Sequence, residues 1–225
     1  MYAAVIACPR SAQRCHPSRR SVCRLVAEIG FSTTFAGFAL RNSQNGCKMV
    51  CVQKYASPVG GILLAADEIG LTGLWFEGEK FFADNLPAKH EEKESPTLAA
   101  AKRWLDIYFK GKEPDFTPPL HPVGSAFRMK VWDILLQIPY GQTVTYGWIA
   151  RQLAAQEGLA RMSAQAVGGA VGRNEISIII PCHRVVGTSG SLTGYAGGLD
   201  RKIALLKTEH VDMSRFFVPK KGTAL

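Results

Sequence analysis

Residues Ile176 to Gly198 read "ISIIIPCHRVVGTSGSLTGYAGG". A β-branched apolar run leads into Pro181 and Cys182, and then into a loop that holds five glycines. Because a proline keeps the preceding residue extended and has no backbone donor, we expect a buried strand over 176–180 that ends at Cys182. Glycines let a backbone approach a ligand closely. The stretch therefore predicts a strand that presents one sulfur to a binding loop.

The chemistry of this stretch depends on whether Cys182 reacts. A thiol becomes a good nucleophile only as the thiolate. His183 is a candidate base, and Glu209 is a candidate carboxylate to orient its imidazole, as in nucleophilic triads. The alternatives are that Cys182 is a small core residue and that the neighbouring histidine points elsewhere. Residue chemistry by itself leaves these alternatives open.

Upstream and downstream of this stretch the pattern is mostly helical. A helix over 125–139 and two short helices with caps at Thr145 and Ser163 are expected, followed by a last helix capped by Asp200. A short helix, a connection and a second helix rich in Ala and Gly are typical of a helix-turn-helix with a long turn. The expected buried residues of these helices are Phe127, Val131, Ile134, Leu135, Leu199, Ile203 and Leu206.

The preceding part of the chain has a different texture. Three short apolar segments separated by turn residues predict an antiparallel meander over 50–78. A helix should then begin with Ser95 as its cap and Pro96 at its first position. The proline-rich 113–123 reads as a linker. We therefore expect an α+β chain with a small domain over 49–112 and a helical domain over 124–225. The expected buried face of the first helix is Leu98, Ala101, Leu105 and Tyr108.

Charge is divided unevenly along the chain. Residues 122–225 hold twelve lysines and arginines against six acids, whereas residues 49–121 hold eight against eleven. A basic C-terminal part suits a polyanionic partner, although unpaired lysines also merely aid solubility. Residues 1–48 are nearly free of acids, which is typical either of an organellar transit peptide or of translated upstream sequence before Met49. We expect an unstructured leader there.

Five of the six cysteines lie in the first 51 residues, so that Cys182 is alone in the body of the chain. A secreted disulfide scaffold would spread its pairs through the fold. A zinc site is not expected, because the Cys47–Cys51 step has no matching second pair. No apolar run approaches the roughly 20 residues that span a bilayer. A reducing cytoplasmic compartment, with no metal and no cofactor, fits this pattern best.

Two segments resemble a known family. "VGGAVGRNEISIIIPCHRVVGTSGSLTGYAGGLDRK" is similar to the active-site signature of the O6-alkylguanine-DNA alkyltransferases, also called methylated-DNA–protein-cysteine methyltransferases. "FRMKVWDILLQIPYGQTVTYGWIA" resembles the segment that precedes it in that family. The resemblance is strong over 124–210 and weaker over 50–120. It implies a small RNase-H-like N-terminal domain and a winged-helix-like C-terminal domain with a helix-turn-helix.

The resemblance implies a reaction in which Cys182 accepts an alkyl group from O6 of guanine, and possibly from O4 of thymine, once per molecule. A chain of Cys182, water, His183 and Glu209 would make the thiolate, and Asn174 would brace the turn before it. Tyr146 would donate to the departing base. The remaining residues expected in the base pocket are Val185, Tyr195, Ala196, Gly197 and Lys202, where the Ala196 N–H faces O6.

The partner implied is double-stranded DNA, bound by a monomer that flips the damaged base out of the stack. The second short helix would enter the minor groove, although its glycines also suit tight helix packing. Many members of the family have arginine where this chain has Gln165, which predicts weaker or more salt-sensitive DNA binding. The main alternative is a lesion sensor without transfer. The residues expected at DNA are Ala164, Gln165, Ala166, Gly168, Gly169, Arg161 and Arg173.

Overall fold

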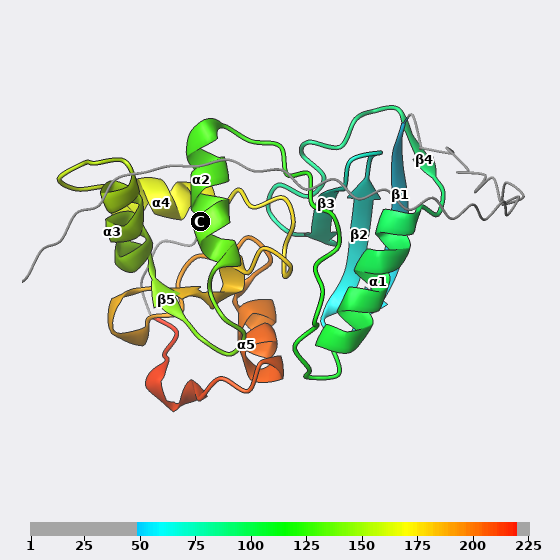
Figure 1. Cartoon of the computed structure of the whole chain (residues 1–225). Helices are drawn as coiled ribbons and strands as arrows, with labels where there is room; N and C mark the ends of the chain where they lie inside the picture. The colour runs from blue at the N-terminus through cyan, green and yellow to red at the C-terminus, as the bar shows by residue number, and fades with distance from the viewer. Residues whose placement is uncertain (1–48, 220–225) are drawn as a thin grey trace, which may run out of the picture. The chain divides into compact units, whose positions relative to one another are not determined.

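The computed structural model describes residues 49–219, so the expectations for residues 1–48 lie outside the described part. Strands β1 (Val50–Ser57), β2 (Gly60–Ala66) and β3 (Leu71–Phe76) form the antiparallel meander that the sequence predicts. A short strand β4 (His90–Glu92) adds to the free edge of β1 in parallel, which gives the order β3-β2-β1-β4 (Figure 1). We did not expect β4, because its three exposed polar residues carry no strand pattern.

Helix α1 (Pro96–Tyr108) packs against this sheet (Figure 1). Its N-terminus is as predicted: the Ser95 hydroxyl accepts the Leu98 N–H at 3.2 Å, and Pro96 occupies the first turn. The predicted apolar face is buried as well. The helix ends at Tyr108, whose fully buried side chain donates a hydrogen bond to Glu209 in the second half of the chain.

The proline-rich linker lies along the outer edge of β3. The Leu71 N–H donates to the Pro119 carbonyl at 2.7 Å, and the His121 N–H donates back to Leu71 at 2.8 Å. A Cβ at Gly70 would lie 2.8 Å from the Pro119 carbonyl oxygen, so glycine is required for this close approach. The linker therefore covers an edge that would otherwise expose unpaired backbone groups.

The second half of the chain contains α2 (Ala126–Leu136), α3 (Tyr146–Gln156) and α4 (Ala164–Val171). The predicted caps are confirmed: the Thr145 hydroxyl accepts from Trp148 at 3.1 Å, and the Ser163 hydroxyl accepts from Ala166 at 3.3 Å. Trp132 on α2 donates its indole N–H to the Ala170 carbonyl on α4 at 3.0 Å. These contacts fix α4 on the buried face of α2. The predicted face of α2 is buried except for Phe127, which is half-buried.

A pair of short strands connects the start of α3 with residues 176–198. Strand β5 (Val144–Thr145) pairs in parallel with β6 (Val185–Val186), which directly follows the one-turn 3-10 helix η1 (Cys182–Arg184). Two more such turns, η2 (Thr188–Gly190) and η3 (Met213–Arg215), flank α5 (Leu199–Thr208) in the sequence. The segment after Cys182 is thereby tied to the N-terminus of α3.

Two details of α5 differ from expectation. The N-cap position is Gly198, with φ 89°, and Asp200 lies inside the first turn instead of capping it. Leu199 and Ile203 are half-buried, whereas Lys202 is fully buried. Compared with the predicted buried face, α5 is rotated so that Lys202 points into the protein. Its ammonium group donates to backbone carbonyls there, which offsets the cost of burying the charge.

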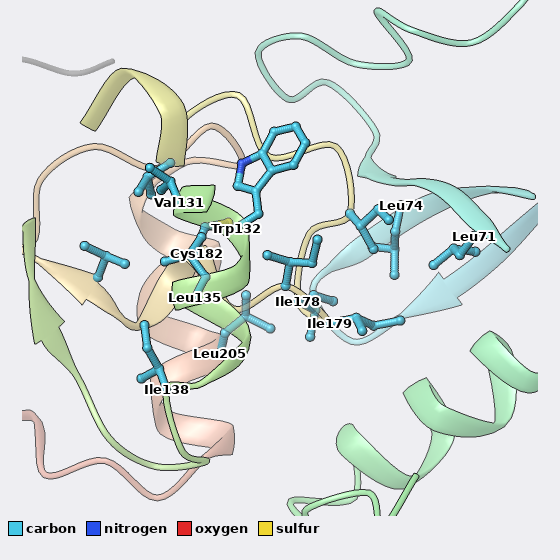
Figure 2. Packing of buried hydrophobic residues seen from close by; sticks show 14 of the residues in the cluster. Leu71, Leu74, Val131, Trp132, Leu135, Ile138, Ile178, Ile179, Cys182 and Leu205 are labelled. Atoms are coloured by element: carbon cyan, nitrogen blue, oxygen red, sulfur yellow. The ribbon is translucent and has the colours of Figure 1, made fainter. Parts of the chain in front are cut away.

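The predicted strand over 176–180 is wrong. Only Ile176 pairs, as an isolated parallel bridge to Leu74 of β3, and the following residues form tight turns with Ile178 at φ 68°. The β-branched composition reflects burial on all sides instead of strand pairing: Ile178 and Ile179 belong to the apolar core that includes Leu74 and Leu135 (Figure 2). Cys182 therefore follows a folded turn and not a strand.

The described residues form an α+β structure with one continuous apolar core, which runs from the sheet through α1 and α2 to Cys182. Within residues 49–219 no helix is long and apolar enough to cross a membrane.

Candidate active site

Cys182 begins η1 and is only 5% exposed. Figure 2 shows its sulfur among the apolar side chains of α2 and α5. It makes its hydrogen bond with Asn174, whose side-chain amide donates to Sγ at 3.0 Å. Such a donor stabilises a thiolate more than a thiol, because the charged acceptor binds a donor more strongly. Asn174 is thus in direct contact with the candidate nucleophile.

Asn174 also organises the turn that delivers Cys182. Its amide nitrogen donates to the carbonyls of Ile180 at 2.8 Å and Ile176 at 3.3 Å, and its oxygen accepts the Ile176 N–H at 3.1 Å. One side chain therefore substitutes for the backbone pairing that a strand would have provided. The expectation that Asn174 braces this segment fits the geometry, although the segment is a turn.

His183 and Glu209 lie together in the interior, with no exposed side-chain surface. Nε2 of His183 lies 2.6 Å from Oε1 of Glu209. Because an ionised carboxylate only accepts hydrogen bonds, Nε2 carries the proton. Nδ1 of His183 is buried and has no partner among the described residues. The imidazole thus turns a free acceptor away from Glu209.

Glu209 is held by several further donors. Arg184 donates to both carboxylate oxygens, with Nε 2.9 Å from Oε2 and Nη2 3.0 Å from Oε1. The Gly141 N–H donates to Oε2 at 3.0 Å, and the Tyr108 hydroxyl donates to Oε1 at 2.9 Å. This set of donors saturates the carboxylate. Neither Arg184 nor Tyr108 was expected in the site.

The electrostatics of the buried groups follow from these contacts. Burial raises the pKa of the Cys182 thiol to about 11, although the Asn174 hydrogen bond and the Lys202 charge oppose the rise. Burial lowers the pKa of His183, and its bond to Glu209 opposes this. Burial by itself would raise the pKa of Glu209, but His183 and Arg184 outweigh it and lower that pKa to about 2. At neutral pH the site therefore holds a protonated thiol, a neutral imidazole and a carboxylate.

The glycine-rich loop after η2 is held from two sides. Nζ of Lys202 donates to the carbonyls of Val185 at 2.5 Å and Thr193 at 3.0 Å. The Tyr146 hydroxyl donates to the carbonyls of Gly194 at 3.1 Å and Thr193 at 3.3 Å. Burial lowers the pKa of Lys202 to about 8. Lys202 and Tyr146 thus both act on the shape of the loop.

The far half of the loop contacts the N-terminal domain. The carbonyl of Ala196 accepts the Lys80 N–H at 3.1 Å. Tyr195 is 9% exposed, and a Cβ at Gly197 would meet the Tyr195 ring at 2.7 Å and Phe76 at 3.1 Å. The Tyr195 ring lies close enough to Cys182 for a thiolate there to raise the phenol pKa, a smaller effect than burial. These predicted pocket residues are packed inside the protein.

An open cavity of about 520 Å³ lies between α4 and this loop. It brings together five predicted residues, Tyr146, Ala164, Gln165, Gly168 and Gly169. Cys182 does not line it. The other residues that line the cavity are Gly147, Gly187, Thr188, Thr193 and Gly194, of which Gly187, Thr193 and Gly194 belong to the loop that the sequence places beside a ligand.

The glycines of α4 are not needed for helix packing. A Cβ at Gly169 would meet nothing within 4 Å, and one at Gly168 would make an ordinary 3.8 Å contact with the Tyr146 ring. The helix-packing explanation for these glycines is therefore unsupported. Ala164, Gln165 and Ala166 are exposed on the same helix.

The two predicted arginines differ in their surroundings. Arg161 is exposed in the connection between α3 and α4. Arg173 forms an ion pair with Asp84 at 3.0 Å, and its guanidinium carbon lies 3.6 Å from the centre of the Phe81 ring. Arg173 thus ties the turn before Asn174 to the N-terminal domain.

No site role was predicted for Tyr108, Arg184 or Glu79. Tyr108 was placed in the apolar face of a helix, Arg184 was quoted only as part of the family signature, and Glu79 was not singled out. Glu79 is 7% exposed, and burial raises its pKa to about 8. The sequence offers a signal only for Arg184, which directly follows His183. Among the described residues no three His, Cys, Asp or Glu side chains gather to hold a metal ion.

Comparison with known proteins places this geometry in a family. The model of the 6-O-methylguanine DNA methyltransferase ribonuclease-like domain matches residues 50–122. The model of the DNA binding domain of the same methyltransferase matches residues 126–211. Together the two models account for almost all of the described chain.

Individual relatives agree. A methylated-DNA–protein-cysteine methyltransferase of Methanosarcina acetivorans is 45% identical over 156 residues, which is 69% of this chain and 95% of the relative. One from Haemophilus influenzae is 40% identical over 158 residues, 70% of this chain and 84% of the relative. The crystal structure of Mycobacterium tuberculosis OGT in complex with DNA has a TM-score of 0.62 at 39% identity, and covers 71% of this chain and 92% of that one. The chain therefore belongs to the 6-O-methylguanine DNA methyltransferase family.

Proposed function

We infer that this protein repairs DNA by direct reversal, transferring a methyl or larger alkyl group from O6 of guanine to its own Cys182. The observation that carries this inference is the Cys182 thiol, held by Asn174 beside a His183–Glu209 pair whose carboxylate is saturated with donors and whose Nδ1 is free. Relatives that match across most of their length are named methylated-DNA–protein-cysteine methyltransferases. Each molecule reacts once, because the thioether formed on Cys182 is not hydrolysed and the thiol is not regenerated.

The covalent step is a displacement at carbon. Sγ of Cys182 forms a bond to the alkyl carbon as the bond between that carbon and O6 breaks, and the electron pair leaves with guanine. The thiol proton goes to His183, and the departing guanine takes a proton from the Tyr146 hydroxyl. The products are S-alkylcysteine and unmodified guanine. Atoms and charge balance once the proton taken up by His183 returns, through water, to the Tyr146 oxygen.

The proton path explains how a thiol with a pKa of about 11 reacts at neutral pH. We propose that a water joins Sγ to Nδ1 of His183, and the free acceptor at buried Nδ1 supports this. Transfer of the proton to Nδ1 creates an imidazolium beside the Glu209 carboxylate, which stabilises it as carboxylates do in triads. The thiolate forms together with its counter-charge instead of alone.

The substrate guanine must leave the DNA stack to reach a buried sulfur, which costs a few kcal/mol and least for a weakly paired base. We place its entrance at the 520 Å³ cavity beside α4. Since Cys182 lies deeper, the Thr193–Gly194 carbonyls must release the Tyr146 hydroxyl as the base enters. The Ala196 N–H and the buried Val185, Tyr195 and Lys202 then shape the inner pocket.

We propose that α3 and α4 act as a helix-turn-helix within a winged-helix-like domain, with α4 in the minor groove. The open space over Gly169 supports a close approach of the backbone to DNA. Gln165 would fill the gap left by the flipped base, without the charge of an arginine. Arg161 is free to bind phosphate, while Arg173 must first give up Asp84, an exposed pair that is worth about 1 kcal/mol or less.

The same reasoning bears on organisation and setting. We propose domains at 49–112 and 124–225 joined by the linker 113–123, and a monomer as the unit that binds one lesion. Because an oxidised sulfur cannot accept an alkyl group, we place the protein in the reducing cytoplasm.

The test is to incubate the protein with duplex DNA that contains one O6-methylguanine and to measure intact and peptide masses. We expect one methyl group on the Cys182 peptide, saturating at one per molecule and absent in Cys182→Ala. Unmodified protein that still binds the lesion would contradict transfer and indicate a sensor. Continued product formation beyond one equivalent would contradict the single-use reaction.

A further inference from the structure

The N-terminal domain places a tyrosine hydroxyl on the His183–Glu209 pair. Tyr108 is the last residue of α1, and its side chain has no exposed surface. Its hydroxyl lies 2.9 Å from Oε1 of Glu209 and 3.3 Å from Nε2 of His183. Since Nε2 and Oε1 are themselves 2.6 Å apart, the three polar atoms form one compact group.

The donors and acceptors of this group have one consistent arrangement. The Tyr108 O–H donates to Oε1, because the carboxylate only accepts. The lone pairs on the Tyr108 oxygen then face Nε2, which suits a protonated Nε2 and opposes an unprotonated one. The hydroxyl thereby favours the tautomer that leaves Nδ1 free as the proton acceptor.

The hydroxyl is also fixed in place and keeps its proton. The Tyr108 ring stacks on Trp104 at 5.2 Å and meets the edges of Tyr140 at 6.1 Å and His183 at 6.4 Å. Burial, and after it the Glu209 charge, raise the pKa of Tyr108 well above its ordinary value. The group therefore remains a donor at any pH at which the protein is folded.

We propose that Tyr108 is a positioning residue for alkyl transfer, through which the ribonuclease-like domain sets the tautomer and orientation of His183. This proposal rests on the proposed function of Cys182. It gives the N-terminal domain a part in the proton path, in addition to covering the core. The substrate does not touch Tyr108, so its effect must fall on the chemical step and not on binding.

The experiment compares Tyr108→Phe with the wild type in single-turnover transfer from duplex DNA with one O6-methylguanine, at varied DNA concentration. The variant keeps the stacked ring and removes one hydrogen bond to a charged group, so we expect the limiting rate to fall about tenfold. The DNA concentration at half-maximal rate should stay within about twofold. Tyr55→Phe is the matched control, because it removes a tyrosine hydroxyl that bonds Asp106 on the same helix at 2.8 Å. Its limiting rate should equal that of the wild type.

A Tyr108→Phe limiting rate within twofold of the wild type would overturn the proposal, and so would a change confined to the half-saturating concentration. A second measurement needs no variant: nitrogen-15 NMR of the histidine rings in the wild type should show His183 protonated at Nε2 and not at Nδ1. The opposite tautomer would overturn the proposal even if the variant does not fold. A wild type that transfers no methyl group would refute the proposed function and leave the tautomer result standing.

Discussion

The two sides of Cys182 are built in opposite ways. On the inner side, Asn174, His183, Arg184 and Glu209 are nearly fully buried and joined by short hydrogen bonds. On the outer side, α4 and the Thr188–Gly194 loop leave an open cavity lined mainly by glycine, alanine and threonine. The buried charges of the inner side are stable only because each is paired and hydrogen-bonded. The small side chains of the outer side make few such contacts, so a substitution there should disturb the fold little.

This difference indicates that the inner side serves the chemical step and the outer side serves DNA binding. Substitutions on the inner side should cost stability and the chemical step together, because removing one partner leaves another buried and unpaired. Substitutions on the outer side should change DNA binding and leave the fold intact. The following predictions test this division, in order of decreasing effect.

The largest effect is expected for Glu209→Gln. The change removes the charge that balances buried Arg184 and replaces one of the two acceptor oxygens with an NH2 donor that faces other donors, so the free energy of unfolding should fall by about 3–5 kcal/mol. Methyl transfer should fall at least about 100-fold, as expected when a general base loses its orienting carboxylate. Chemical denaturation and single-turnover assays measure both quantities. Glu157→Gln, which breaks the exposed pair with Lys130, should cost about 1 kcal/mol or less and leave transfer unchanged.

The low pKa of Glu209 adds a pH dependence to this comparison. Its folded pKa of about 2 lies below its unfolded value, so its contribution to stability is complete above about pH 4.5 and is lost as the pH falls toward 2. As the pH falls through this window, the thermal unfolding temperature of the wild type should therefore drop more steeply than that of Glu209→Gln. Parallel curves for the two proteins would contradict the depressed pKa.

Glu79→Gln should act in the opposite direction. Burial raises the folded pKa of Glu79 to about 8, so the folded state holds a proton that the unfolded state releases above about pH 4.5. Stability is then lost as the pH rises from about 4.5 to 8, and the neutral amide should raise the free energy of unfolding at pH 7 by about 1–3 kcal/mol. The gain should vanish at pH 4. A loss of stability at pH 7 would show that the carboxylate is ionised and paired.

On the outer side, Gln165→Arg should strengthen DNA binding. A guanidinium at position 165 adds one positive charge near the phosphates, so the affinity should rise severalfold. The salt dependence should steepen by about one counterion, so of the two expectations for Gln165 we retain the weaker binding and not the greater salt sensitivity. Binding isotherms of Cys182→Ser forms at several salt concentrations measure this. The free energy of unfolding should not change. An unchanged affinity would mean that Gln165 does not reach the DNA.

Only a small effect on the fold, and a favourable one, is expected for Gly169→Ala. Since a Cβ there meets no atom within 4 Å, the helix should gain up to about 1 kcal/mol of stability. If DNA approaches this backbone closely, the affinity for DNA should nevertheless fall severalfold. A variant that is more stable and binds DNA equally well would show that Gly169 does not lie at the DNA interface.

The confirmed parts of the sequence analysis are those in which the signal is local. The caps at Ser95, Thr145 and Ser163 were predicted from single hydroxyl residues before apolar periodic runs, and each hydroxyl accepts a hydrogen bond from the backbone N–H three residues ahead. The meander over 50–78 was predicted from turn residues between short apolar segments. Such features depend on neighbours in the sequence, so the sequence contains what is needed to find them.

The failures all involve contacts between distant residues. The run at 176–180 reads as a strand, but the Asn174 side chain and the edge of β3 take up its backbone groups, and it folds into turns. Asp200 was a reasonable cap, yet the partners of Lys202 rotate α5 so that Gly198 begins the helix. In both cases side-chain hydrogen bonds and tertiary contacts outweigh a local preference of about 1 kcal/mol.

From the amino-acid sequence we could identify the family, a candidate nucleophile, the positions of most helices and the change in composition between the two halves of the chain. Only the tertiary structure decided that Tyr108 and Arg184 join His183 around Glu209, that Glu79 is buried, and that the glycines of α4 face open space. The physical reason is that a side chain's type sets which bonds it is able to make, while burial and the approach of distant backbone decide which of them are made.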